Sequence, residues 1–267
     1  HPENWDLDWV GHSEMAGSYR DIVHSISDSL DFLETVLGRA VHQTQRADIY
    51  AAHEGLHLSY EQSQTRYLEH RNRWYNLTTH FPWIGMRTAQ LDGAHVDYFR
   101  GISNPMGIKV GPGMTVEWLQ NLLRVLNPNN EPGRISLIHR FGATLVEEGL
   151  PPLIKAVKET GAPVLWVCDP MHGNTESTAD GTKTRRFNNI VNELKTSFEV
   201  HESMGSYLGG VHLELTGENV TECTGGARGL TDGDLARAYK SPVDPRLNYE
   251  QAMEVAMTIA GLTKANA

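Results

Sequence analysis

The sequence predicts an α/β fold with a parallel sheet, and three observations support this prediction. Short apolar runs that suit strands alternate with stretches of helical periodicity along most of the chain. One such run, Val164–Asn174, ends abruptly in a cluster of the polar residues Asp169, His172 and Asn174. The length of 267 residues suits one domain, because a barrel of eight alternating strands and helices takes ~250 residues. Alternation alone leaves both a closed barrel and a doubly wound sheet open.

Six segments are expected to contain strands. The first, Ala47–Tyr60, is interpreted as a strand followed by a loop. The other five are His80–Met86, Met106–Gly111, Arg134–Arg140, Pro163–Asp169 and Gly209–Thr216. Residues 1–46 show no convincing strand pattern and are expected to form a helical N-terminal segment, with residues 47–267 as one barrel-type domain.

Helical spacing of apolar residues covers residues 25–37, 116–126, 153–160, 189–200 and 249–262. Gly38 suits the end of the first of these helices, and Thr115 can cap the second. Pro152 suits the first turn of the third helix, and Gly161 suits its end. The pattern therefore places a helix after most of the expected strands.

The composition restricts the classes of partner. A net charge of −10 argues against nucleic acid, because phosphate binding needs a basic face. No apolar run approaches the ~20 residues of a membrane span. The two cysteines, Cys168 and Cys223, suggest no disulfide framework, so a reducing, cytoplasmic compartment is expected.

Three cations stand at or near the ends of successive expected strands: Arg87, Lys109 and Arg140. The ends of parallel strands in a barrel meet at one face, where an active site lies. Converging arginine and lysine side chains would suit a phosphate or a carboxylate. Each of them alone is more often a surface or ion-paired residue, so the hypothesis rests on the three together.

Three further residues are candidate metal ligands: His172, Glu214 and Asp244. Glu214 lies in the apolar run VHLEL, where a carboxylate needs a partner or a metal. An imidazole with two carboxylates would suit Mn²⁺, Co²⁺, Zn²⁺ or Fe²⁺ acting as a Lewis acid. The alternative for each is a structural histidine or a solvated loop carboxylate.

Lys183, Arg185 and Arg186 in GTKTRRF form a basic loop that would suit a second phosphate, although a solvated loop explains it equally well. No glycine-rich dinucleotide fingerprint opens a helix after a strand, and no serine or cysteine nucleophile stands in a known elbow.

Several long strings in the sequence are more specific than these patterns. They are WIGMRTAQLDGAHVDYFRGISNPMGIKVGP, NPNNEPGRISLIHRFG, CDPMHGNT, KTRRF, GGVHLELTGENVTEC and DPRLN. In this order, from roughly residue 47 onward, they closely resemble the class II (plant-type) 3-deoxy-D-arabino-heptulosonate 7-phosphate (DAHP) synthases.

The resemblance implies a (β/α)₈ TIM barrel that condenses phosphoenolpyruvate with erythrose 4-phosphate, the entry step of the shikimate pathway. On this basis residues 47–267 would be the catalytic domain. Lys109, Arg140 and His172 would be catalytic, and Arg87, Lys109, Arg140 and Arg185 would bind substrate. His172, Glu214 and Asp244 would hold a divalent metal, Mn²⁺ or Co²⁺ first, with Zn²⁺ or Fe²⁺ as alternatives. Small phosphorylated or 2-oxo acid substrates and a homo-oligomer are the expected partners.

The chain departs from the family pattern in three ways. The family's barrel starts before the segment that matches His1, and that earlier part carries two strands and a cysteine metal ligand. Met86 stands where the family usually places an acid before the arginine. Val243 stands where many relatives have a cysteine before the metal-binding aspartate.

Three functional interpretations stay open at this point. The first is a DAHP synthase whose front part is absent or on another chain. The second is a short relative that joins a 2-oxo acid or phosphoenolpyruvate to a different aldehyde, which Met86 favours. The third is a non-catalytic homologue that binds a partner through an unpaired strand edge.

Overall fold

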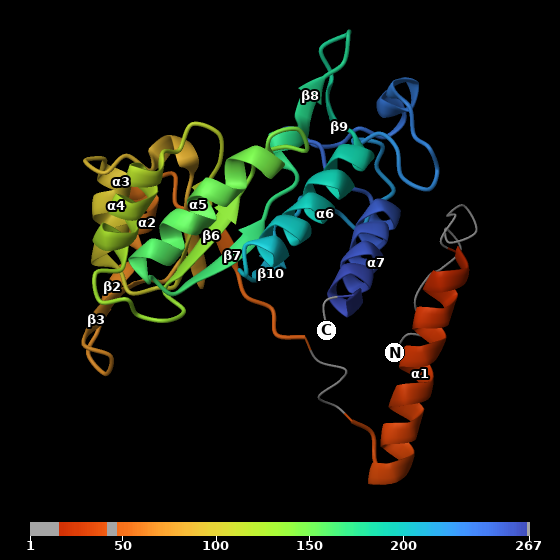
Figure 1. The fold of residues 1–267 in the computed structure, drawn as a ribbon, viewed down its shortest axis with the longest axis horizontal. Helices are drawn as coiled ribbons and strands as arrows, with labels where there is room; N and C mark the ends of the chain where they lie inside the picture. The colour runs from red at the N-terminus through yellow and green to blue at the C-terminus, as the bar shows by residue number, and fades with distance from the viewer. Residues whose placement is uncertain (1–15, 42–46, 266–267) are drawn as a thin grey trace. The chain divides into compact units, whose positions relative to one another are not determined.

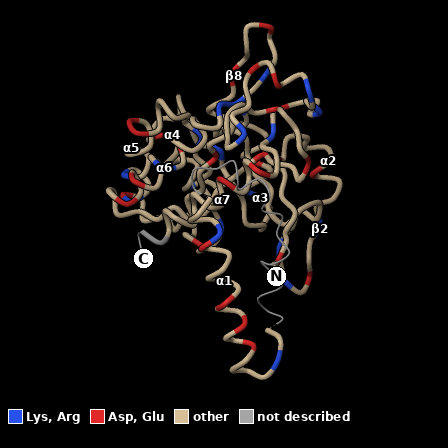
Figure 2. Tube along the Cα trace, turned by 90° about the vertical axis from the view of Figure 1, so that its right-hand side faces the viewer, with Lys and Arg blue, Asp and Glu red and all other residues tan. Residues whose placement is uncertain are grey.

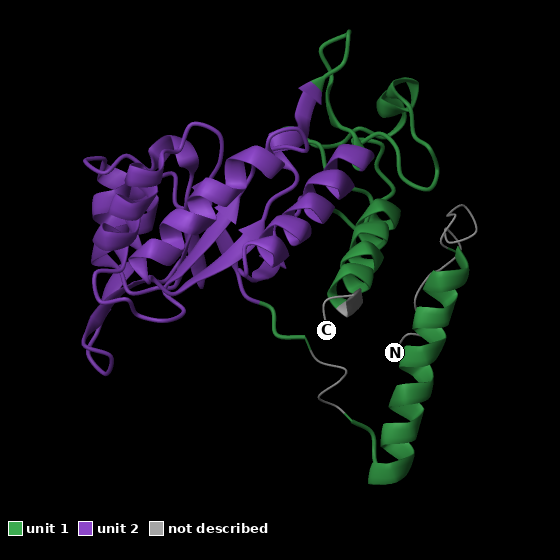
Figure 3. Ribbon diagram, viewed as in Figure 1, with its two compact units in different colours: residues 1–49, 177–187, 215–267 green, residues 50–176, 188–214 purple. Residues whose placement is uncertain are grey.

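The computed structural model of the chain describes residues 16–41 and 47–265. The chain divides into two compact units (Figure 3). The smaller unit comprises residues 1–49, 177–187 and 215–267, and the larger comprises residues 50–176 and 188–214. Residues 1–15 and 42–46 of the expected N-terminal segment lie outside the described residues, and its boundary at residue 46 stays a prediction.

The larger unit is built on a six-stranded parallel sheet, which confirms the predicted fold class at this level. The strands, in their order across the sheet, are β1 (Ala52–Glu54), β4 (Phe81–Ile84), β5 (Met106–Val110), β6 (Ile135–His139), β7 (Val164–Cys168) and β10 (Leu208–Val211). Each falls within one predicted segment or overlaps it. The order never reverses, unlike the order in a doubly wound sheet. Among the described residues, β1 and β10 each pair with one strand only.

Helices connect these strands, and α4, α5 and α6 lie side by side along one face of the sheet (Figure 1). The helices of this unit are α2 (Leu58–Ser63), α3 (Ala94–Gly101), α4 (Val116–Leu126), α5 (Val146–Thr160) and α6 (Phe187–Ser203). The core between sheet and helices includes Ile108, Leu122, Leu137 and Ile154, all fully buried. Each such side chain contributes about 1.5–3 kcal/mol to the free energy of unfolding.

Three of the predicted helix signals are confirmed and one is wrong. Gly38 directly follows α1 (Ala16–Leu37) and is in the left-handed conformation, at φ 62°. Thr115 caps α4, because its hydroxyl accepts the backbone N–H of Trp118 at 3.1 Å. Gly161 ends α5 in the left-handed conformation, at φ 66°. Pro152 does not begin α5, because the helix starts at Val146 and carries Pro151 and Pro152 inside it.

Strand β10 is shorter than predicted, ending at Val211 rather than reaching Thr216. Its pairing with β7 shifts register between Leu208 and Gly210. One further ladder bond follows, from the His212 N–H to the Cys168 carbonyl at 2.8 Å. Glu214 therefore lies beyond the strand end, half-buried in a loop, and not within an apolar strand as the sequence suggested.

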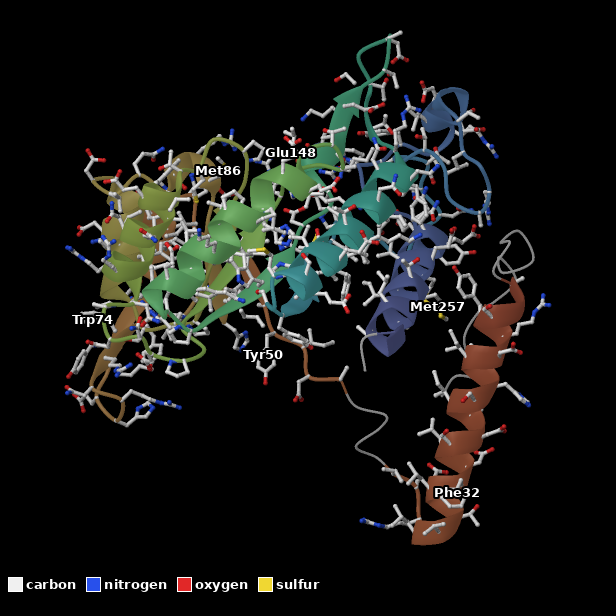
Figure 4. The ribbon with its side chains drawn as sticks, in the orientation of Figure 1. Phe32, Tyr50, Trp74, Met86, Glu148 and Met257 are labelled. Carbon is white, nitrogen blue, oxygen red and sulfur yellow. The ribbon has the colours of Figure 1, made fainter. Side chains whose placement is uncertain are left out.

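The smaller unit contains two long helices, α1 (Ala16–Leu37) and α7 (Tyr249–Ala265). Both were predicted from periodicity, although α1 begins earlier than residue 25. Tyr19 of α1 and Met257 of α7 form a small buried cluster, with Val23 and Met253 packed against it. Figure 4 shows Met257 on the side of α7 that faces α1.

Short elements complete the fold. The hairpin of β2 (Thr65–Leu68) and β3 (Arg73–Asn76) precedes β4, and β8 (Thr175–Ser177) pairs with β9 (Lys183–Arg185) where the chain passes between units. These strands were not predicted. Lysine, arginine and acidic residues are interspersed along the chain, and most of the coloured residues of α1 are acidic (Figure 2). No helix among the described residues is long and apolar enough to cross a membrane.

Candidate functional site

Three neighbouring strands of the larger unit lead into charged residues at one edge of the sheet. Lys109 lies near the end of β5, Arg140 directly follows β6, and Asp169 directly follows β7. His172 begins the 3₁₀ helix η5 (His172–Asn174). Parallel pairing of β5, β6 and β7 sends all these ends to the same edge. The structure therefore brings together Lys109, Arg140 and His172, as the sequence led us to expect.

Lys109 is a buried cation whose ammonium group pairs with the buried carboxylate of Asp169. Lys109 is 6% exposed and Asp169 is 0% exposed. Burial lowers the pKa of Lys109 despite the opposing effect of Asp169, and the nearby charge of Arg140 lowers it further. The ammonium also lies 5.7 Å from the ring centroid of Trp83, within cation–π range. Lys109 therefore gives up a proton more readily than an ordinary lysine.

Asp169 fixes the orientation of His172. Its Oδ1 accepts the backbone N–H groups of Met171 and His172, and its Oδ2 lies 2.8 Å from Nδ1 of the His172 ring. The other ring nitrogen, Nε2, lies 3.3 Å from Oε1 of Glu214. Burial favours the neutral ring, but hydrogen bonds to Asp169 and Glu214 raise the pKa of His172 to about 9. A carboxylate on one nitrogen of an imidazole commonly orients the other nitrogen toward a metal.

The donor atoms around His172 fit a divalent metal. Two ligand atoms that are each ~2.1 Å from one ion lie about 3.0 Å apart in an octahedral site and about 3.4 Å apart in a tetrahedral one. Nε2 of His172 is 3.3 Å from Glu214 Oε1. Asp169, His172 and His212 also form a group whose ligand atoms lie within 4.8 Å of one another. Burial lowers the pKa of His212 to about 4, so its ring is neutral at pH 7 and able to coordinate.

Arg140 offers a donor that has no acceptor within the part of the chain that the structure describes. Its Nη2 donates to the carbonyl of His172 at 3.0 Å, but its buried Nε has no hydrogen-bond partner among the described residues. A buried donor without an acceptor is costly, so this nitrogen indicates a place for an anion. Arg87 follows β4 in the 3₁₀ helix η4 (Met86–Thr88), and its side chain is exposed.

Met86, labelled in Figure 4, occupies the position where an acid was expected. It lies beside the end of β5, where a Cβ added to Gly111 would come 3.5 Å from Met86 Sδ. A thioether cannot accept a proton or pair with Arg87, so this substitution changes the polarity next to the strand end.

Asp244 belongs to the smaller unit, where its Oδ1 lies 3.2 Å from Nζ of Lys183. The loop that carries Asp244 is held by Glu222, whose carboxylate is 0% exposed. Glu222 accepts the backbone N–H groups of Lys240, Ser241 and Arg246, and it also accepts two N–H groups of the Arg246 guanidinium. Burial alone would raise the pKa of Glu222, but these bonds, led by that of Arg246, lower it.

Arg185, expected to bind substrate, is fully buried in the smaller unit. Its guanidinium donates to the carbonyl of Pro245, next to Asp244. The neighbouring cations are engaged too, Lys183 with Asp244 and Arg186 with Asp232. In this arrangement Arg185 supports the Asp244 loop, and its contact with substrate stays a prediction that requires the side chain to become accessible.

The family model for the class-II DAHP synthetase family matches residues 1–260. The chain belongs to the class-II DAHP synthetase family. The match begins at residue 1, so it extends the resemblance that the motifs showed from residue 47. All the candidate site residues lie within the matched range, so the family match covers the strand ends that carry them.

Two relatives illustrate how far the likeness reaches. A phospho-2-dehydro-3-deoxyheptonate aldolase of Neurospora crassa is 44% identical over 97% of this chain and 57% of its own length. The protein AroG of Mycolicibacterium smegmatis, which has the same name, is 43% identical over the same shares. The chain thus spans a little over half the length of these relatives.

A solved structure with the same protein name, from Francisella tularensis, is more distant. It superposes with a TM-score of 0.46 at 15% identity, over 70% of this chain and 56% of that chain. A score this low carries no argument about the fold, which therefore rests on the strands and helices themselves.

Some residues in and around the candidate site were not assigned from the sequence. Asp169 stood inside a quoted motif but had no role, and His212, Glu193 and Glu222 had none either. A buried carboxylate is hard to find from sequence, because an acid within an apolar helical pattern is usually interpreted as a solvated one.

Proposed function

We propose that the chain forms the catalytic part of a DAHP synthase, which condenses phosphoenolpyruvate with erythrose 4-phosphate and releases phosphate. The observation that carries this proposal is the continuous set Lys109, Asp169, His172 and Glu214 at one edge of the parallel sheet, with Arg140 beside it. The relatives' names and the family membership support the same activity.

The three cations of the strand ends would hold phosphoenolpyruvate. The free buried Nε of Arg140 suits a phosphate or carboxylate oxygen, and the exposed guanidinium of Arg87 offers a second fork. Lys109 supplies a charge that is already desolvated, so its attraction for an anion is weakly screened. Holding both anionic substrates close offsets the repulsion that would otherwise keep them apart.

His172 and Glu214 would be metal ligands, and Asp244 would complete the set, as the motifs imply. A bound divalent ion, Mn²⁺ or Co²⁺ before Zn²⁺ or Fe²⁺, would supply Lewis acidity at the aldehyde carbonyl. Asp169 keeps Nδ1 of His172 engaged, which leaves Nε2 for the ion. The rigid Asp244 loop, held by Glu222, favours a ligand of fixed position.

Lys109 would act as a proton donor in the reaction. In the condensation C3 of phosphoenolpyruvate attacks the aldehyde, water adds at C2, and phosphate leaves. The Nζ of Lys109 has a lowered pKa and therefore can donate a proton to an oxygen that develops charge next to it. Asp169 then stabilises the position of Nζ throughout, because it pairs with that atom.

A second candidate activity is an aldol-type condensation with a different aldehyde. Met86 favours it, because a thioether next to the end of β5 replaces a polar contact that the family usually has. A non-catalytic binding role is disfavoured by the retained Lys109, His172 and Glu214. Further parts of the proposal are a closed (β/α)₈ barrel in the whole protein, a homo-oligomer and a cytoplasmic location.

The proposal can be tested in the protein that contains this chain by Glu214→Gln. We expect loss of bound Mn²⁺ and a fall of at least tenfold in phosphate release from phosphoenolpyruvate plus erythrose 4-phosphate. Glu218→Gln, an exposed acid in the same segment, is the matched control. Unchanged metal content and turnover in Glu214→Gln would reject the assignment, and turnover with another aldehyde alone would favour the second activity.

A further inference from the structure

Glu193 is a buried carboxylate on the face of α6 that packs against the sheet. Its neighbours on that face include Ile190, Leu194 and Ser197, and all four residues are 0% exposed. A carboxylate in this environment is unfavourable unless hydrogen bonds satisfy both oxygens. Glu193 lies outside the group of charged residues at the strand ends, so its presence in the core needs its own explanation.

Both oxygens of Glu193 bind the loops that follow β6 and β7. Oε1 accepts the backbone N–H groups of Phe141 at 2.8 Å and Gly142 at 2.9 Å. Oε2 accepts the side-chain amide N–H of Asn174 at 2.7 Å. One side chain thus joins the segment directly after Arg140 to the short helix that begins at His172.

Asn174 completes the connection between the two loops. Its Oδ1 accepts the backbone N–H of Ala143 at 2.9 Å, and its Nδ2 also donates to the carbonyl of Pro170 at 2.9 Å. Every polar atom of the Asn174 amide is therefore engaged with one of the two loops or with Glu193. Asn174 is 8% exposed, so water competes little for these bonds.

The two loops touch so closely that only glycine fits at their contact. A Cβ added to Gly142, which has φ +85°, would come 2.6 Å from the carbonyl oxygen of Gly173. Gly142 directly precedes Ala143, whose backbone N–H is bound by Asn174. Gly173 directly follows His172. Arg140 adds its own bond to the His172 carbonyl at 3.0 Å. The position of each loop therefore depends on the other.

From these contacts we propose that Glu193 and Asn174 are positioning residues that set Arg140 and His172 at their working distance from each other. Neither residue touches the atoms assigned to substrate or metal. Glu193 binds the backbone N–H groups one and two residues after Arg140. Asn174 binds backbone groups three residues after Arg140 and two residues before His172. The inference rests on the proposed function for its consequence, because Arg140 would bind phosphoenolpyruvate and His172 would bind the metal.

The test replaces the acceptor in the hydrogen bond between Glu193 and Asn174 by a donor. Glu193→Gln presents an N–H group to the Asn174 amide nitrogen, so two donors face each other. We expect faster backbone amide exchange at Phe141, Gly142 and Ala143, and a fall of about tenfold or more in Mn²⁺ affinity and kcat. The measurements are made at pH 8, where the Glu193 carboxylate, with a pKa of about 7, is mostly ionised.

A double variant provides the rescue. In Glu193→Gln with Asn174→Asp, the new amide at position 193 can donate to the new carboxylate, which still accepts the Ala143 N–H. The Pro170 carbonyl loses its donor and faces a carboxylate oxygen instead, so Mn²⁺ affinity, kcat and amide protection should recover in part, to at least about threefold above the single variant. Glu199→Gln, an exposed acid on the same helix, is the control and should change nothing.

The outcomes separate this inference from the proposed function. If the single variant unfolds more easily but keeps kcat, KM and Mn²⁺ affinity per folded molecule, Glu193 is merely structural and the inference fails. It also fails if the double variant is no better than the single one. If the unchanged protein shows no condensation, the proposed function fails. Amide exchange and the ring-nitrogen shifts of His172 still decide whether Glu193 and Asn174 position that ring.

Discussion

Glu193 in the larger unit and Glu222 in the smaller unit do the same structural task in different electrostatic surroundings. Each side chain is 0% exposed, and each accepts backbone N–H groups from a loop within its own unit. Burial raises the pKa of Glu193 to about 7, although bonds from Gly142 and Phe141 oppose it. The pKa of Glu222 is lowered instead.

The difference lies in one guanidinium. Arg246 donates to both oxygens of Glu222, at 2.8 Å and 3.0 Å, whereas the side-chain donor to Glu193 is the neutral amide of Asn174. Hydrogen bonds from neutral groups lower the pKa of a buried carboxylate but do not offset the cost of removing the charge from water. The Asp244 loop is therefore held by a charge pair. The loops that carry Arg140 and His172 are held by a network in which the ionised form of Glu193 is unfavourable.

The largest expected effect comes from Arg246→Met. It leaves a buried carboxylate without its cation, so the free energy of unfolding at pH 7 should fall by about 3 kcal/mol or more. Because the lowered pKa of Glu222 contributes stability above its unfolded pKa of about 4.5, that loss should shrink as the pH falls below 4.5. Urea unfolding at pH 7 and pH 3.5 measures both values.

Arg237→Met is the matched control, because Arg237 is an exposed arginine paired with Asp234 in the same unit. It should cost less than about 1 kcal/mol. An equal loss for Arg246→Met at both pH values would mean that the apolar part of the arginine, not its charge, holds the loop.

Glu193→Gln should give the opposite pH dependence. The pKa of Glu193 is raised to about 7 in the folded protein, so between pH 4.5 and 7 the unfolded chain loses a proton that the folded protein keeps. Stability of the unchanged protein therefore falls across this range, by up to about 3 kcal/mol from this group. Glu193→Gln removes that slope, so its unfolding free energy should improve relative to the unchanged protein as the pH rises.

The measurement is chemical unfolding at pH 4.5, 6 and 8, with Glu222→Gln in parallel. Glu222→Gln should become more damaging as the pH rises through 4.5, because it removes a group that is most stabilising when ionised. Stability curves for the two variants that run parallel to each other would refute the contrast between the two glutamates.

The sequence predicted the strands of the sheet better than it predicted the residues that hold the loops around the candidate site residues. Six predicted segments contain or overlap the six strands. The signal was clearest for β5 and β6, because a parallel strand buried on both faces is visible as a short, mostly apolar run. Lys109, Arg140 and His172 were found from their place at strand ends. Glu214 was placed in a strand that in fact ends at Val211, because a register shift is not encoded in the apolar pattern.

The supporting residues could not be predicted, for a physical reason. Glu193 and Glu222 act on backbone groups, and a backbone N–H carries no sequence signature. Arg185 shows the reverse error, since a basic loop suggests an exposed phosphate site while the structure buries that guanidinium against the Pro245 carbonyl. Pairing between distant segments decides these roles, and spacing along one segment does not show it.

The smallest expected effect is that of Lys183→Met. Lys183 and Asp244 form an ion pair at 3.2 Å, with side chains 54% and 33% exposed. Exposed pairs of this kind contribute 0.2–1 kcal/mol or less, so the unfolding free energy at pH 7 should change by no more than about 0.5 kcal/mol. Lys240→Met, which breaks the exposed pair with Glu218, is the matched control and should behave alike. If Lys183→Met lowered the unfolding free energy almost as much as Arg246→Met, the surface ion pair would be the main contact that holds the Asp244 loop. The comparison of Glu222 with Glu193 would then no longer explain how that loop is held.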